Sequence, residues 1–383
     1  MKKSKRNCEV ICMKNSFGNN ITVTIFGESH GPAIGVTIDG LAPGIKLDLD
    51  YIKKRMSQRQ AKGRISTQRH EPDELNIISG WFEGRTTGTP LTILIENTNT
   101  RSKDYEKTRY RLRPSHADYT AFAKYDGFQD FRGGGHFSGR LTAPLVAAGA
   151  IAQQILEQKG IFIGSHMLSC HQVKDIPFAK DEIKLKEQIS YLNDQDFPVI
   201  DTDCAQQMHT VIEAAANDGD SVGGIIETAV VGFPAGIGEP FFDSVESVLS
   251  HLLFSVPAVK GVQFGLGFDF GNYFGSQAND AICYEDGKIR TKTNHNGGIN
   301  GGISNGMPIL FQCAVKPTAS IYKEQDTVDY QSRQPVKLQI QGRHDPAILH
   351  RARVVIDSVT ALGLLDLACT KQGTDFMKKE VKA

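Results

Sequence analysis

The chain lacks an excess of charge of either sign, because 43 Lys and Arg residues balance 43 Asp and Glu residues among 383. Binding to nucleic acid without sequence preference requires many uncompensated Lys and Arg side chains, so the charge balance argues against this function. It also gives no reason to expect an anionic membrane surface as a partner. A phosphorylated ligand must therefore be held by a local basic site.

Long hydrophobic runs and paired cysteines are also lacking. The longest apolar stretch, 145–156, contains two glutamines and is too short to cross a bilayer. The seven cysteines are dispersed and form no Cys-x-x-Cys pair, which indicates reduced thiols in the cytoplasm rather than a disulfide framework or a metal site. Residues 1–12 are basic without the apolar core of a signal peptide.

No linker, charge block or repeat divides the chain. We therefore expect 1–12 to be a disordered extension, with Met13 as an alternative start, and 13–383 to form a single domain. Short β-branched runs predict strands at 21–26, 33–38, 91–96, 224–231, 308–315 and 336–340. Helices are predicted from Asp48 or Asp50 to 60 and at 141–159, 181–192, 203–216, 242–253 and 345–367. Their irregular order favours an α+β fold with antiparallel sheets, in which the apolar helix 141–159 is buried.

Glycine is abundant, with 38 residues, and several glycine clusters carry chemically useful side chains. His30 lies between glycines directly after a predicted strand and could act as an acid or base on a ligand. The alternative is a buried histidine that bonds to the turn. His116 lies beside Arg111 and Arg113, a pattern that suits an anion site with a proton donor. Here the alternative is a solvated basic loop.

Two further clusters indicate phosphate recognition. The glycine triplet 133–135, between Arg132 and Arg140, could cradle a phosphate or the polar edge of a flavin. The turn 316–320 offers a lysine and two hydroxyl groups, and the alternative for it is a surface turn. Asp345, followed by Pro346, is either a general base or a helix N-cap, and the pattern alone favours the N-cap. Together, the clusters predict an enzyme that acts on a multiply anionic small molecule.

Eleven segments, in this order, resemble chorismate synthase, over about 15–367. They are Phe-Gly-Glu-Ser-His-Gly at 26–31, Thr-Gln-Arg-His-Glu-Pro-Asp at 67–73, Phe-Glu-Gly-Arg-Thr-Thr-Gly-Thr-Pro at 82–90, Asn-Thr-x-x-Arg-Ser-Lys-Asp-Tyr at 97–105, Arg-Pro-Ser-His-Ala-Asp-Tyr-Thr at 113–120, Arg-Gly-Gly-Gly at 132–135, Gly-Phe-Pro-Ala-Gly at 232–236, Ala-Val-Lys-Gly-Val at 258–262, Asn-His-x-Gly-Gly-Ile-x-Gly-Gly-Ile-Ser at 294–304, Lys-Pro-Thr at 316–318 and Gly-Arg-His-Asp-Pro at 342–346.

The resemblance implies a β-α-β sandwich, with a helical layer between two antiparallel sheets, that assembles as a homotetramer. It implies the last step of the shikimate pathway to the aromatic amino acids. In this step, 5-enolpyruvylshikimate 3-phosphate loses phosphate and a C6 hydrogen by anti-1,4-elimination and becomes chorismate. Reduced FMN is required although the reaction has no net redox change.

The resemblance also implies roles for single residues. His30 would protonate the reduced flavin, His116 would assist the departure of phosphate, and Asp345 would lie near flavin N5. The implied FMN contacts are His136, Phe137, Ser138, Ala258, Gly301, Lys316, Pro317, Thr318, Ala319, Ser320 and Arg343. The implied substrate or NADPH contacts are Arg59, Arg64, Arg69, Arg113 and Arg132.

The sequence departs from the family pattern at three places. His136-Phe137-Ser138-Gly139-Arg140-Leu141-Thr142 replaces the usual Arg-Ser-Ser-Ala-Arg-Glu-Thr, Gln58 occupies an arginine position, and Ala319 replaces a serine. Because of Gln58, and because no separate nicotinamide domain is visible, we expect an external flavin reductase to supply the electrons rather than NADPH directly. A flavin- or anion-binding protein without catalysis is the alternative function. A dehydrogenase is disfavoured, since no glycine-rich strand-to-helix fingerprint with a downstream acid occurs.

Overall fold

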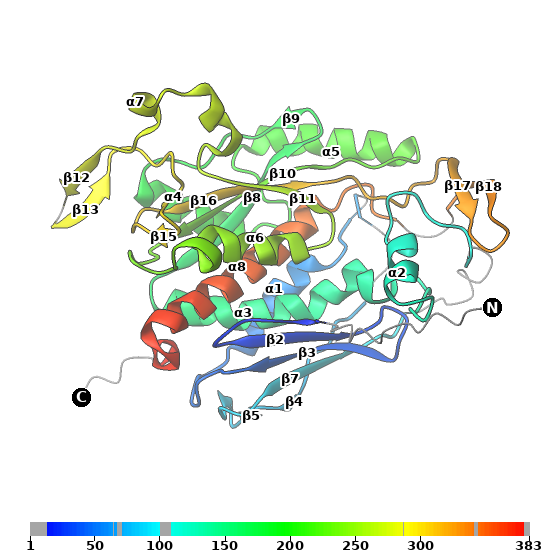
Figure 1. Cartoon of the computed structure of the whole chain (residues 1–383), viewed down its shortest axis with the longest axis horizontal. Helices are drawn as coiled ribbons and strands as arrows, with labels where there is room; N and C mark the ends of the chain where they lie inside the picture. Colours follow the sequence, from blue (N-terminus) through cyan, green and yellow to red (C-terminus); the bar gives the residue numbers. More distant parts are fainter. Residues whose placement is uncertain are drawn as a thin grey trace, which may run out of the picture.

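Two antiparallel sheets enclose a layer of helices in the computed structural model, which describes residues 14–63, 65–66, 71–99, 109–285, 287–340 and 344–378 (Figure 1). The first sheet has the order β1 (Ser16–Phe17), β2 (Thr22–Gly27), β3 (Ala33–Asp39), β7 (Leu91–Glu96) and β4 (Asn76–Ser79). The second has the order β11 (Val259–Phe264), β16 (Ile309–Val315), β10 (Gly224–Val231), β8 (Phe162–Cys170) and β9 (Val173–Lys174). The predicted α+β sandwich is thereby confirmed.

The helices fall into two groups. Between the sheets lie α1 (Leu49–Arg59), α3 (Thr142–Gln158), α6 (Val245–Ser255) and α8 (Leu349–Gln372). Outside this layer lie α2 (Asp118–Lys124), α4 (Glu182–Asn193), α5 (Thr202–Asn217) and α7 (Gly275–Ala278). Small hairpins pair β5 (Trp81–Phe82) with β6 (Arg85–Thr86), β12 (Ile282–Glu285) with β13 (Lys288–Thr291), β14 (Ile299–Asn300) with β15 (Ile303–Ser304), and β17 (Gln325–Asp329) with β18 (Gln334–Leu338).

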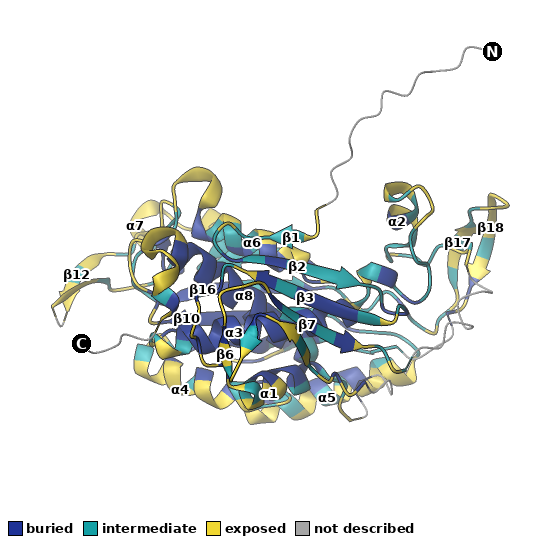
Figure 2. Cartoon of the chain, turned by 90° about the horizontal axis from the view of Figure 1, so that it is seen from below, coloured by how far each residue is buried: buried dark blue, intermediate teal, exposed yellow. Residues whose placement is uncertain are grey.

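The helical layer is the centre of the hydrophobic core, and one apolar cluster includes residues of both sheets, α3 and α8. Figure 2 shows α3 and α8 mostly in the colour of buried residues, whereas α4 and α5 carry long exposed stretches. The two central helices approach closely at Gly149, where a Cβ atom would lie 2.2 Å from the Ser358 Cβ atom. A residue larger than glycine at position 149 would therefore force the two helices apart. Among the described residues, no helix combines the length and apolarity needed to cross a membrane.

Local sequence signals account for the boundaries of some elements. The Asp48 carboxylate accepts hydrogen bonds from the backbone N–H groups of Asp50 and Tyr51, which confirms Asp48 as the N-cap of α1. The strands predicted at 91–96 and 224–231 have these same boundaries in the structure. The ends of these elements were predictable from the local sequence.

The N-cap predicted at Asp345 is wrong, because α8 begins four residues later, at Leu349, after Ile348. The Asp345 carboxylate instead forms an ion pair with Arg351 at 2.6 Å. The carbonyl of Pro346 accepts a hydrogen bond from the N–H of Val222, next to the start of β10. The chain at Pro346 is therefore hydrogen-bonded to the residues just before β10, and α8 starts only after this contact.

Candidate functional site

The ends of several elements converge on a cavity of about 870 Å³. The cavity is lined by His30 after β2, His116 before α2, Lys316 after β16 and Asp345 before α8. The sequence-predicted site residues that line it are His30, Arg113, His116, His136, Phe137, Ser138, Ala258, Lys316, Pro317, Thr318, Ala319, Ser320 and Asp345. Segments more than 300 residues apart along the chain thus form one concave site of a size typical for small ligands.

His30 is held between its neighbour and the glycine triplet. The Ser29 hydroxyl lies 3.1 Å from Nδ1 of His30, whose residue is only 7% exposed. A Cβ atom at position 133 would lie 2.5 Å from Cε1 of His30, so only glycine leaves room for the imidazole there. The fixed ring can present a proton to a ligand in the cavity without prior rearrangement.

His116 is held by a carboxylate behind it. Its Nδ1 atom lies 2.9 Å from Oδ1 of Asp118, and Asp118 also accepts two side-chain hydrogen bonds from Arg113. Burial alone would raise the pKa of Asp118, but the hydrogen bonds from Arg113 and His116 outweigh burial and lower this pKa. Arg113 also donates from Nη2 to the carbonyl of Gly133, so the loop before α2 is tied to the glycine triplet.

The turn after β16 has the properties of an anion site. The Thr318 hydroxyl is buried and has no hydrogen-bond partner among the described residues. Lys316 donates from Nζ to the carbonyl of Ser115 at 2.7 Å and from its backbone N–H to the carbonyl of Ala258. Ser115 and Ala258 both adopt a left-handed backbone conformation, with φ of 56° and 75°. Strain of this kind, held next to a cavity, is typical of a functional site.

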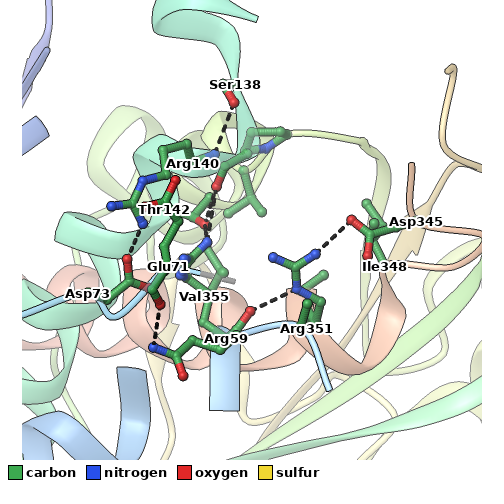
Figure 3. Close-up of a pocket in the computed structure, with 16 residues that line it drawn as sticks. Arg59, Glu71, Asp73, Ser138, Arg140, Thr142, Asp345, Ile348, Arg351 and Val355 are labelled. Atoms are coloured by element: carbon green, nitrogen blue, oxygen red, sulfur yellow. Dashed lines mark hydrogen bonds and ion pairs between the residues drawn. The ribbon is translucent and has the colours of Figure 1, made fainter. Parts of the chain in front are cut away.

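A smaller cavity of about 260 Å³ adjoins the first and shares Ser138 and Asp345 with it (Figure 3). Arg59 and Arg140 converge there on the Asp73 carboxylate, and Arg59 approaches it to 2.8 Å. Burial would raise the pKa of Asp73, but the charges of the two arginines outweigh burial and lower it.

Further charged groups line this smaller cavity. Burial lowers the pKa of Arg59 to about 10, partly offset by Asp73, so its guanidinium remains charged at neutral pH. Its Nε atom is buried without a hydrogen-bond partner among the described residues. Arg351 bridges the Asp345 carboxylate and the carbonyl of Arg59. The carboxylates of Asp73, Asp345 and Glu71, which also lines the cavity, balance the charges of the three arginines.

Some predicted residues do not join the site. Gly301 lies in the β14–β15 hairpin, which Figure 1 shows at the opposite end of the molecule from α2, and it does not line the large cavity. Arg132 does not line this cavity either, and its side chain forms an ion pair with Asp130 at 2.7 Å. The predictions for Arg64, Arg69 and Arg343 lie outside the described residues.

Asp73, Asp118 and Arg351 received no role from the sequence, and Arg140 was considered only as a flank of the glycine triplet. Asp73 and Arg140 stand within or beside the quoted motifs, but their pairing across 67 positions leaves no local signal. For Asp118 a signal exists, namely a carboxylate two positions after a histidine at the start of a helix. Arg351 gives no such signal, because Asp345 lies before α8 and a spacing of six residues does not bring two side chains together on a helix.

Comparison with known proteins agrees with this geometry. A family model described as chorismate synthase matches residues 21–369. The chorismate synthase of Pyrococcus abyssi is 44% identical over 91% of this chain and 96% of its own length. That of Chitinophaga pinensis is 45% identical over 95% of this chain and 99% of its own length. A crystal structure of chorismate synthase superposes with a TM-score of 0.74 and 26% identity, covering 95% of this chain and 96% of the other.

The fold, the cavity and these matches define the class of the protein first: it is an enzyme, a lyase. The chain belongs to the chorismate synthase family, and thereby to aromatic amino-acid biosynthesis.

Proposed function

We propose that the chain converts 5-enolpyruvylshikimate 3-phosphate to chorismate and inorganic phosphate by anti-1,4-elimination with reduced FMN. The C6–H bond and the C3–O bond to phosphate break, and the electron pair of the C–H bond enters the ring as a new double bond. The observation that carries the proposal is that His30, His116 and Asp345 line one cavity together with the 316–320 turn. Family membership supports the same reaction.

The residues of the cavity fit a phosphate-bearing flavin. The unpartnered Thr318 hydroxyl and the Lys316 ammonium group lie on one turn, as a phosphate requires. Lys316, Thr318 and Ser320 would hold the phosphate, and Ala258 with 136–138 would border the rest of the cofactor. Reduced FMN, when bound, lends electron density to the substrate and takes it back, so that no net redox change results.

The chain itself supplies positioned acids and bases. His116 would deliver a proton from its cavity-facing nitrogen to the departing phosphate, which lowers the charge on the leaving group. Asp345, held by Arg351, would accept the proton that leaves C6. The His30 ring, held by Ser29 and by the close approach of Gly133, would carry a second proton at the edge of the cavity.

Substrate carboxylates would bind at the smaller cavity. Arg59, Arg140 and Arg351 line this cavity and would donate hydrogen bonds to a carboxylate, while Glu71, Asp73 and Asp345 balance their charges. A second carboxylate or the phosphate would bind at Arg113. The Nε atom of Arg113 donates to Asp118 and its Nη2 atom to the carbonyl of Gly133, and these bonds hold the guanidinium group in place. Positioning of this kind lowers the entropic part of the activation barrier, because the reacting groups are already held together.

Reduction of FMN would come from a separate flavin reductase. The Gln58 side chain is buried, accepts a hydrogen bond from Arg55 and donates one to the carbonyl of Asn193. The position therefore offers no charge to NADPH at either cavity. Activity under air with NADPH and FMN as the sole additions would refute this proposal.

We further propose a cytoplasmic homotetramer. Aromatic side chains at Phe241, Phe242, Phe268 and Phe274 are between 79% and 90% exposed. Exposed apolar groups of this size favour association with another surface. The thiols of Cys170, Cys204, Cys283, Cys313 and Cys369 are free, as in a reducing compartment. Sedimentation of the purified chain would test the assembly.

An anaerobic assay tests the reaction. The full-length chain is mixed with 5-enolpyruvylshikimate 3-phosphate and dithionite-reduced FMN, and chorismate and phosphate are quantified. We expect equal amounts of both products, and none when FMN is kept oxidised. Turnover with oxidised FMN, or bound FMN without any product, would contradict the proposal.

A further inference from the structure

The carboxylate of Asp118, the first residue of α2, is fully occupied by hydrogen-bond donors. Its Oδ2 atom accepts from the backbone N–H of Arg113 at 2.9 Å and from Nε of Arg113 at 2.8 Å. Its Oδ1 atom accepts from Nη2 of Arg113 at 2.6 Å and lies 2.9 Å from Nδ1 of His116. The arrangement leaves the carboxylate no room to rotate and no lone pair in need of a proton.

The protonation of this pair follows from its partners. The hydrogen bonds of Arg113 and His116 overcome burial and lower the pKa of Asp118, so the carboxylate is ionised near neutral pH. An ionised carboxylate only accepts hydrogen bonds, and Nδ1 of His116 must therefore carry a proton. The other nitrogen, Nε2, has no partner among the described residues, and the His116 side chain lines the large cavity at 22% exposure.

We propose that Asp118 is a positioning residue that fixes the proton of His116 on Nδ1 and stabilises the cationic ring. Asp118 does not line the large cavity, so it acts through His116. The inference rests on the proposed function, in which His116 protonates the leaving phosphate. In that step the Nε2–H proton moves to a phosphate oxygen, the electron pair of the C3–O bond stays with phosphate, and His116 remains neutral with its Nδ1–H bonded to Asp118. The ring then regains a proton from solvent.

A purely structural role is the competing explanation. Through Arg113 and the carbonyl of Gly133, Asp118 also connects α2 to the glycine triplet. Loss of this connection would misplace the loop without any specific effect on the imidazole. The two roles differ in one observable quantity, which is the nitrogen that carries the proton in neutral His116.

The Asp118→Asn variant separates the two roles. Arg113 donates to both carboxylate oxygens, and its two bonds to Oδ2 favour an amide oxygen at that position. The amide NH₂ group then faces Nδ1 of His116, which must become an acceptor, so the proton moves to Nε2. We expect kcat to fall by about 10²–10⁴-fold, with a smaller change in KM, because the ring can no longer be stabilised as a cation.

The readout is ¹⁵N magic-angle-spinning NMR of the full-length chain labelled with [¹⁵N]histidine, with His116 assigned by difference from His116→Ala. We expect a protonated Nδ1 in the wild type and a protonated Nε2 in Asp118→Asn. Asp126→Asn removes one negative charge from an exposed position just after α2 and serves as the matched control. It should leave the tautomer and kcat unchanged.

Three outcomes would overturn the proposal. They are an unchanged tautomer in Asp118→Asn, a kcat loss that multiplies with that of His116→Ala in the double variant, and an equal loss in the Asp126 control. If Asp118→Asn fails to fold, Asp118→Glu keeps a carboxylate and should retain the Nδ1 proton with kcat within about tenfold of wild type; loss of that proton would refute the role. Full activity of His116→Ala would instead contradict the proposed function, and the NMR result would still decide the positioning.

Discussion

Two histidine–aspartate pairs in this molecule have the same bond and different surroundings. His116 and Asp118 lie at the large cavity, whereas His166 on β8 and Asp175 are entirely buried beside the second sheet. The distance from Nδ1 to the carboxylate is 2.9 Å in both. The second nitrogen differs, since Nε2 of His166 meets Glu227 at 3.0 Å and that of His116 has no partner among the described residues. An unoccupied second nitrogen together with a place on the cavity wall distinguishes a histidine that can act on a ligand.

The buried pair is satisfied in every direction. Asp175 also accepts hydrogen bonds from the backbone N–H groups of Ile176, Ile200 and Asp201, and Glu227 accepts them from Phe178 and Gln312. Burial would lower the pKa of His166, but its two carboxylate partners outweigh burial and raise it, so the ring is cationic. This cluster therefore fastens the segment before α5 to the sheet and leaves no group for catalysis.

The largest effect is expected from His116→Ala on activity. Removal of a general acid costs about 10²–10⁴-fold in rate, whereas the half-buried ring adds little to stability. The assay is anaerobic formation of chorismate and phosphate with reduced FMN, together with the melting temperature. A variant that keeps wild-type kcat would show that His116 does not serve as the acid.

His166→Gln is expected to lower the stability of the fold and to leave activity nearly unchanged. Loss of the cation leaves Asp175 and Glu227 buried without a positive partner, which costs about 3–5 kcal/mol of unfolding free energy. Activity per folded molecule should stay within about twofold, since no ligand meets this cluster. Urea unfolding measures the first quantity, and His171→Gln, at an exposed histidine after β8, is the control. Equal stability of both variants would contradict the comparison.

The sequence predicts one of these two histidines and misses the other for a physical reason. His116 stands within five residues of Arg111 and Asp118, so its chemistry is visible in a short window. The partners of His166 lie 9 and 61 residues away, and Glu227 reaches it only after β8 and β10 have paired. A histidine inside an apolar strand gives no sign of them.

The same limit explains the rest of the site. Local rules predict α1, α3, α4, α5, α6 and α8 and the strands β2, β3, β7, β10, β16 and β18, because hydrophobic period and turn chemistry are local properties, but they miss the long strand β8. They fail at Asp345, where Arg351 and the neighbouring sheet override the capping preference. The smaller cavity could not be predicted either, because Arg59, Asp73 and Arg140 come together only through α1, α3 and the loop that follows α1.

The pH dependence of the unfolding free energy also tests the role assigned to the buried His166. The pKa of His166 is raised in the folded chain, so its contribution to stability is complete below about 6.5, the unfolded value, and is lost as pH rises through the folded value. Wild-type unfolding free energy should therefore decline as pH increases above neutrality, and this decline should be weaker in His166→Gln. Denaturant titrations across this range measure both slopes. Parallel slopes would mean that His166 is not the titrating group.

The smallest effect concerns His350 on α8, a third histidine with a different environment. Burial and the charge of Arg351 lower its pKa to about 4, and Nε2 lies 2.8 Å from the Ser66 hydroxyl. A neutral buried histidine stabilises fully above about 6.5, and the contribution is lost as pH falls towards about 4. We expect the wild type to lose about 1 kcal/mol between pH 7 and 5.5 from this group, and His350→Gln to lose less. Urea unfolding at the two values tests this. If His350→Gln declined as steeply as the wild type, the acid sensitivity would have to come from groups other than His350.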